Sequence, residues 1–276
     1  FYTDRASQKF LVIDGQQRLK SVFYFFEGYF GEQQKGKRQV FQLTGLGQKS
    51  RYYGRTYGEL SEQDQSRFKN SVLRAFIVQQ LDPNDDTSVY HIFERLNTGG
   101  TLLTNQEVRN CVYHGALNVL LTHLNNLPEW RTILGKPKAD SRYKDVELIV
   151  RFLSLLSLDQ YQKPMKDHLS RYMRRNAAPS EEKKARIRAL FESTCKRVTA
   201  ALGSKPFHVR SGLNAAVFDS VMVAFALSDK EIPSDAPDRY RALLEDKEFL
   251  KATQQATTDP DSVRDRFALA RQTLFG

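Results

Sequence analysis

Five consecutive residues near the start of the chain carry groups that can handle phosphate. Asp14-Gly15-Gln16-Gln17-Arg18 stands between two apolar runs, in "FLVIDGQQRLKSVFYFF". A strand that leads through a glycine turn into a helix presents free backbone N–H groups and the positive end of the helix dipole at one point. Such a point binds phosphate. The structural alternative is a helix start capped by Asp14, with Arg18 on the surface.

Each side chain of this stretch would have its own task at a phosphate site. The Arg18 guanidinium could grip phosphate oxygens through two hydrogen bonds. Asp14 could hold Mg²⁺ or orient water. Gln16 and Gln17 could bind a base, a ribose or an attacking water molecule. The stretch is not a Walker motif, because no G-x-x-x-x-G-K-[ST] pattern occurs in the chain.

A second polar segment, "FERLNTGGTLLTNQEVRN", lies between two predicted helices. Its candidate ligand-binding residues are Arg95, Asn97, Thr98 and Gly99, followed by Glu107, Arg109 and Asn110. The loop exposes amides and a hydroxyl, which suits a binding site. The alternative is a simple turn between helices, with Thr104 and Glu107 forming a capping box.

Three further groups have weaker functional signals. In "YKDVELIVRF", Glu147 and Arg151 are four residues apart and are expected to pair on one helix face, while Asp145 points to another; a buried structural ion pair is the favoured interpretation. The basic segment "RYMRRN" (residues 171–176) could contact a nucleic-acid backbone or end a solvated helix. The histidines and cysteines show no metal-ligand spacing.

Composition limits the classes of protein that are possible. The chain has 276 residues, 40% of them apolar, and a net charge of +10. That length can build one large core or two smaller ones, and the charge favours polyanionic partners, although a merely basic protein is the alternative. No apolar run reaches the roughly 20 residues of a membrane helix, and no signal peptide is visible, so a cytoplasmic location is expected. The chain starts with Phe1 rather than Met, and we expect that an upstream piece is missing.

The local patterns predict an α+β protein with two domains. Residues 1–103 mix signals for strands ("KFLVID", "RQVFQLTGL", "SVLRAFIVQQL") and helices (residues 16–30, "SEQDQSRF", "DTSVYHIFERLN"). Residues 104–276 are helical almost throughout, with one long segment in "NQEVRNCVYHGALNVLLTHLNNL" and a helix from Ser180 to Gly203. Two polar helices are expected in the last 45 or so residues, separated near Pro260.

Taken together, "VIDGQQRL", "FERLNTGGTLLTNQEVRN" and "DVELIVRF" resemble the DGQQR-motif family. That family supplies the N-terminal, NTP-hydrolysing half of GmrSD-type modification-dependent restriction systems and related phage-defence proteins. The terminal "ATTDPDSVRDRFALARQTL" resembles the closing helix of the family, so the likeness extends over essentially the whole chain. The resemblance implies a ParB/sulfiredoxin-like α/β nucleotide-binding domain in residues 1–103 and a helical domain in residues 104–276.

The resemblance also implies roles for individual residues. Asp14, Gln17 and Arg18 would be catalytic and Gly15 and Gln16 would bind nucleotide, with Arg95, Asn97, Thr98 and Gly99 lining the site and Glu107, Arg109 and Asn110 as neighbours. The ligand would be a nucleoside triphosphate of unspecified base with Mg²⁺, which Asp14 would hold. DNA would be a partner.

The sequence departs from the family pattern in two respects. The Ile-Pro-x-x-Gln-Arg segment that normally precedes the DGQQR strand is not found, which agrees with a missing upstream piece. The HNH-type nuclease domain of many members is not found either, so we expect DNA cleavage to need a partner or fused domain. The alternatives are a DNA-binding or modified-DNA-sensing module with little catalysis, and a nuclease that uses the ParB-like domain itself.

Overall fold

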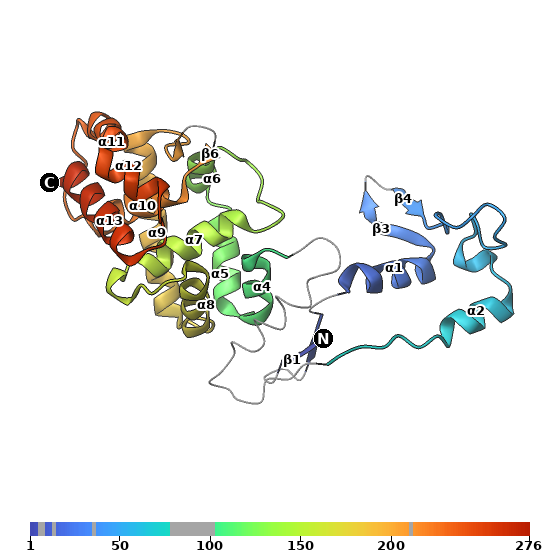
Figure 1. Ribbon diagram of the computed structural model, residues 1–276. Helices are drawn as coiled ribbons and strands as arrows, with labels where there is room; N and C mark the ends of the chain where they lie inside the picture. Colours follow the sequence, from blue (N-terminus) through green and yellow to red (C-terminus); the bar gives the residue numbers. More distant parts are fainter. Residues whose placement is uncertain (5–8, 13–14, 35–36, 78–102, 210–211) are drawn as a thin grey trace. The chain divides into compact units, whose positions relative to one another are not determined.

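The chain folds into two compact units, Phe1–Gly100 and Thr101–Gly276. The computed structural model describes residues 1–4, 9–12, 15–34, 37–77, 103–209 and 212–276 (Figure 1). Helices dominate and short antiparallel strand pairs accompany them, which confirms the predicted α+β class. No helix in these ranges is both long and apolar enough to span a bilayer.

The described part of the first unit consists of short elements. In chain order they are β1 (Tyr2–Asp4), β2 (Lys9–Leu11), α1 (Gln16–Glu27), β3 (Tyr29–Gln34), β4 (Lys37–Val40), the 3-10 helix η1 (Tyr57–Glu59) and α2 (Glu62–Lys69). β1 pairs antiparallel with β2, and β3 with β4. The strand predicted in "KFLVID" and the helix predicted from residue 16 are confirmed, and Ser61 caps α2 as expected.

An aromatic cluster holds the carboxyl-terminal half of α1 in place. The buried ring of Phe25 packs edge-on against Phe41, Tyr57 and Phe68 at centroid distances of 5.2–5.7 Å. Such pairs add to the free energy gained from burial. Phe23 of the same helix is 60% exposed, so the cluster anchors α1 through Phe25 and not through Phe23.

Two predicted strands differ from the structure. β4 ends at Val40, and Leu43 instead bonds through its backbone to Gly54 and Arg55. Residues 71–77 of "SVLRAFIVQQL" form no strand. The side chains of Val72 and Phe76 are 86% and 85% exposed. A strand needs a ladder of backbone hydrogen bonds, so the apolar, β-branched composition of this segment is not sufficient.

The second unit is helical apart from one short hairpin in its described part. Its elements are α4 (Asn105–Val112), α5 (Ala116–Asn125), α6 (Pro128–Leu134), α7 (Lys144–Leu155), the 3-10 helix η2 (Leu158–Gln160), α8 (Met165–Arg175), α9 (Glu181–Leu202), β5 (His208–Val209), β6 (Gly212–Leu213), α10 (Ala215–Leu227), α11 (Ala236–Glu245), α12 (Lys247–Gln254) and α13 (Pro260–Phe275). α9 begins at the cap Ser180 and stops at Gly203, as predicted.

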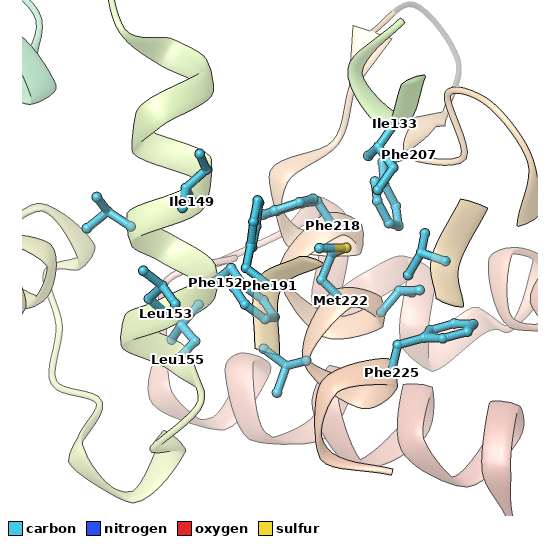
Figure 2. Packing of buried hydrophobic residues seen from close by; sticks show 14 of the residues in the cluster. Ile133, Ile149, Phe152, Leu153, Leu155, Phe191, Phe207, Phe218, Met222 and Phe225 are labelled. Carbon is cyan, nitrogen blue, oxygen red and sulfur yellow. The ribbon is translucent and has the colours of Figure 1, made fainter. Parts of the chain in front are cut away.

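The core of the second unit is built around α10. This helix is buried on all sides from Ala216 to Phe225, and α7, α9 and α13 pack against it. A helix that is apolar all round belongs at the centre of a core. Figure 2 shows Phe152, Phe191 and Phe218 meeting between α7, α9 and α10, with Phe152 and Phe191 5.5 Å apart.

Two expectations about the helices were wrong. The segment predicted as one long helix is divided into α4 and α5, because the chain at Gly115 approaches Ala177 so closely that a Cβ there would lie 2.6 Å from the Ala177 carbonyl oxygen. The amide of Leu117 then donates to the same oxygen. The last part of the chain forms three helices rather than two, since α11 and α12 are separated at Asp246, which caps α12.

Candidate nucleotide site

The turn before α1 has the geometry of an open helix start. Gly15 is the N-cap residue with φ 84° and ψ 10°, in the left-handed region, and no side chain in the described part of the chain caps the helix. The first turn contains no acidic residue. The N-cap position thus belongs to Gly15 and not to Asp14, which lies outside the described residues, while Arg18 is exposed as the structural alternative expects. The first N–H groups of α1 are placed as an anion site requires.

Arg18 folds back over this turn. A Cβ placed on Gly15 would lie 3.3 Å from an Arg18 terminal guanidinium nitrogen and 3.4 Å from Nε. Glycine is thus favoured by the positive φ, and a larger residue would also shift the flexible guanidinium by a few tenths of an ångström. The exposed Gln16 and Gln17 side chains belong to the same turn, and the Gln17 carbonyl accepts a hydrogen bond from Ser21 Oγ at 2.9 Å.

The remaining members of the predicted site fall outside the described residues. These are Asp14, Arg95, Asn97, Thr98 and Gly99. That the two polar segments share one cleft stays a prediction. Within the described residues, no group of three or more His, Cys, Asp or Glu side chains could hold a metal ion, so a magnesium role for Asp14 also stays a prediction.

Glu107 has a structural task at the start of α4. The backbone N–H of Thr104 donates to a Glu107 carboxylate oxygen at 2.6 Å, and the Glu107 N–H donates to Thr104 Oγ1 at 3.2 Å. This is the capping box that the sequence predicts. Arg142 forms an ion pair with the same carboxylate at 3.0 Å.

Arg109 and Asn110 also make contacts inside the second unit. Arg109 is fully buried; its guanidinium pairs with Glu147 and donates through Nε to Gln106 Oε1 at 2.9 Å. The amide oxygen of Asn110 accepts hydrogen bonds from Gln106 at 2.8 Å and Asn118 at 3.3 Å. Glu107, Arg109 and Asn110 therefore each make structural contacts within the helical unit.

The charged residues of α7 are buried or partly buried, but their partners differ from the expected ones. Instead of pairing with each other along the helix, Glu147 pairs with Arg109 and Arg151 pairs with Asp219. Asp145 binds Arg131 at 2.9 Å. The favoured interpretation, buried structural ion pairs, is confirmed with partners that lie far apart in the sequence.

Substitution of Gly15 tests the geometry of the turn. Gly15→Ala places a side chain at a positive φ, which costs about 1–2 kcal/mol, and pushes the Arg18 guanidinium aside. We expect a lower unfolding temperature and weaker anion binding. Gly47→Ala is the control, because Gly47 has open space around it and no positive φ. Equal stability and binding in the two variants would contradict this account of the turn.

Comparison with known proteins gives one match. No curated protein and no solved structure matches the chain. One family model matches the first part of the chain and ends just beyond α4, so the expected resemblance of the closing helix stays a prediction. The match includes the glycine turn and the second polar loop. Residues 1–114 match the model of the family described as the GmrSD restriction endonuclease, N-terminal domain, which confirms the predicted resemblance over that part of the chain.

Proposed function

We propose that this chain is a nucleoside-triphosphate-binding and -hydrolysing module of a restriction system directed against phage DNA. The observation that carries the proposal is the turn at Gly15, where the Arg18 guanidinium adjoins a helix start that no side chain of the described residues caps. The family match supports the restriction context. The nucleotide domain would be residues 1–103, with a ParB/sulfiredoxin-like fold.

The proposed chemistry is attack of water on the γ-phosphate. Phosphoryl transfer needs positioning and neutralisation of charge more than covalent catalysis. The N–H groups at the start of α1 and Arg18 would bind and neutralise the phosphates, with Mg²⁺ held by Asp14. Gln17 would orient the attacking water, and Arg95, Asn97, Thr98 and Gly99 would complete the site from the second polar loop.

The partners we propose are DNA and a nuclease. A net charge of +10 favours association with DNA. A partner or fused domain of the HNH type would cut the DNA, so hydrolysis in this module would control the nuclease rather than cleave the target. DNA binding with little catalysis is the competing function, and it requires no phosphate release.

Phosphate release from GTP, CTP, UTP and ATP, measured with the full-length protein, tests the proposal. Arg18→Ala is expected to lower the rate at least tenfold, which corresponds to about 1.4 kcal/mol, because the charge on the transferred phosphoryl group loses its counter-charge. Asp14→Ala is expected to have a similar effect.

Lys20→Ala is the matched control, because Lys20 is an exposed cation two positions further along the same helix. It should leave the rate within twofold of the wild type. The proposal fails if the wild-type protein neither binds nor hydrolyses any of the four triphosphates, or if the Lys20 and Arg18 variants behave alike.

A further inference from the structure

A concave pocket of about 660 Å³ lies among α7, α8 and α9 in the second unit. Its ionisable lining residues are His168, Arg171, Tyr172, Arg175, Lys183 and Arg186. The lining contains four cations and no carboxylate. In the sequence, Arg171 and Arg175 belong to the basic segment at residues 171–176. The sequence does not show that the first turns of α9 bring Lys183 and Arg186 to the same space.

A second cavity of this unit has a different balance of charge. It measures about 820 Å³, and its charged lining residues are Lys136, Arg142 and Lys144 together with Asp140, Asp145 and Glu147. Three positive and three negative side chains cancel there. The one-sided charge of the pocket among α7, α8 and α9 is therefore a local feature and not a consequence of the basic composition alone.

The cations of the pocket are weakly neutralised by the protein. In the described part of the chain, neither Arg175 nor Lys183 forms an ion pair. Arg186 lies 3.7 Å from Glu182, and both side chains are largely exposed, so that pair contributes little. Arg171 donates to the Gln162 carbonyl oxygen at 3.1 Å. Like charges gathered in one concavity attract an anion.

The rest of the lining fits an anion that also carries an apolar part. Leu153, Leu156, Ile187 and Leu190 supply an apolar wall. His168 is buried, and burial lowers its pKa; the charges of Arg171 and Arg175 lower it further, whereas the hydrogen bond to the Ser154 carbonyl oxygen opposes the shift. The ring is therefore neutral at pH 7 and adds no charge. A volume of this size accommodates a small molecule.

We propose that this pocket binds a small phosphorylated ligand of mononucleotide size, with its phosphates on the cations and its apolar part against the leucines and isoleucine. The site belongs to the helical unit and does not use the turn at Gly15. A duplex nucleic acid would instead be expected to meet a ridge or stripe of cations, because its phosphates follow an extended backbone. The cations here line one concave space.

Equilibrium binding of inorganic pyrophosphate and of ATP tests the proposal. The site variant is Arg175→Gln/Lys183→Gln, which removes two exposed cations from α8 and α9. Its dissociation constants for both ligands are expected to rise at least tenfold. The ATP measurement is repeated in an Arg18→Ala background. The rise in the dissociation constant caused by the pocket substitutions should persist there, since Arg18 does not line the pocket.

The matched control is Arg188→Gln/Lys196→Gln, which removes the same charge from exposed positions of α9 outside the pocket. It should change the dissociation constants less than twofold. Absence of pyrophosphate binding in the wild type, or equal effects of the two double variants, overturns the proposal. If only binding of a single-stranded oligodeoxynucleotide falls in the site variant, the ligand is a nucleic-acid backbone and the small-molecule proposal is wrong.

Discussion

Asp219→Asn is expected to lower the free energy of unfolding of the helical unit by about 3–5 kcal/mol, the cost of breaking a buried ion pair. Asp219 is fully buried in α10 and accepts hydrogen bonds from Arg151 of α7, with Nε at 3.1 Å, and from Arg266 of α13 at 3.5 Å. Asparagine keeps the shape of the side chain. It removes the carboxylate that both guanidinium groups contact, of which the one of Arg266 is fully buried.

Arg266 makes this site sensitive to the loss of charge. Its side chain is fully buried, and among the described residues its Nε has no hydrogen-bond partner. Burial lowers the pKa of Arg266, whereas the charge of Asp219 raises it. Once the carboxylate is replaced by an amide, the two guanidinium groups would face each other in a medium of low dielectric constant, where repulsion is poorly screened.

Urea unfolding followed by circular dichroism measures the effect, as a lower midpoint at an unchanged slope. Asp261→Asn is the control, because Asp261 pairs with Arg264 on the surface of α13, and exposed pairs contribute at most about 1 kcal/mol. The triple variant Asp219→Leu/Arg151→Met/Arg266→Met is expected to recover much of the lost stability. A loss below about 1 kcal/mol in Asp219→Asn would contradict the account of the triad.

Arg109→Leu is expected to cost about 2–3 kcal/mol, less than the loss of Asp219, because the Glu147 carboxylate that remains is one third exposed. Arg109 is fully buried, pairs with Glu147 and donates to Gln106, and its Nη1 lies 3.4 Å from the Lys166 carbonyl oxygen. Leucine leaves each of these acceptors without its donor, and unpaired buried groups pay their desolvation cost. The free energy of unfolding reports the loss.

This variant separates two roles for Arg109. Arg142→Leu is the control, because the Arg142–Glu107 pair also involves α4 but is partly exposed, and it should cost no more than about 1 kcal/mol. If Arg109→Leu instead keeps its unfolding midpoint and loses nucleotide binding, Arg109 belongs to the nucleotide site, as the family resemblance implies. The structural account would then be wrong.

Local signals in the sequence predicted the start and end of several helices. Ser61, Thr104 and Ser180 cap α2, α4 and α9 as expected, since a cap depends on contacts within three residues of the chain. Predictions that needed a distant partner succeeded less often. Residues 71–77 have a strand-like composition but form no strand in the described structure, because a ladder depends on another segment.

For the candidate site, the sequence by itself determined the chemistry available at the turn before α1. Gly15 is required by the backbone, and Arg18 lies one helical turn away, so the geometry of the turn, which we propose binds an anion, follows from local structure. The motifs also predicted the family that residues 1–114 match. Local sequence fixes such features because every atom involved lies within a few residues.

Only the tertiary structure decided how the buried charges pair and where the cations of the helical unit gather. Glu147 could have paired with Arg151 along α7, but packing against α4 and α10 supplied Arg109 and Asp219 instead. Lys183 joins the arginines of α8 only because the start of α9 lines the same pocket as that helix. Coulomb energy depends on distance and desolvation, and both are set by which helices pack together, which the spacing of residues along one helix does not specify.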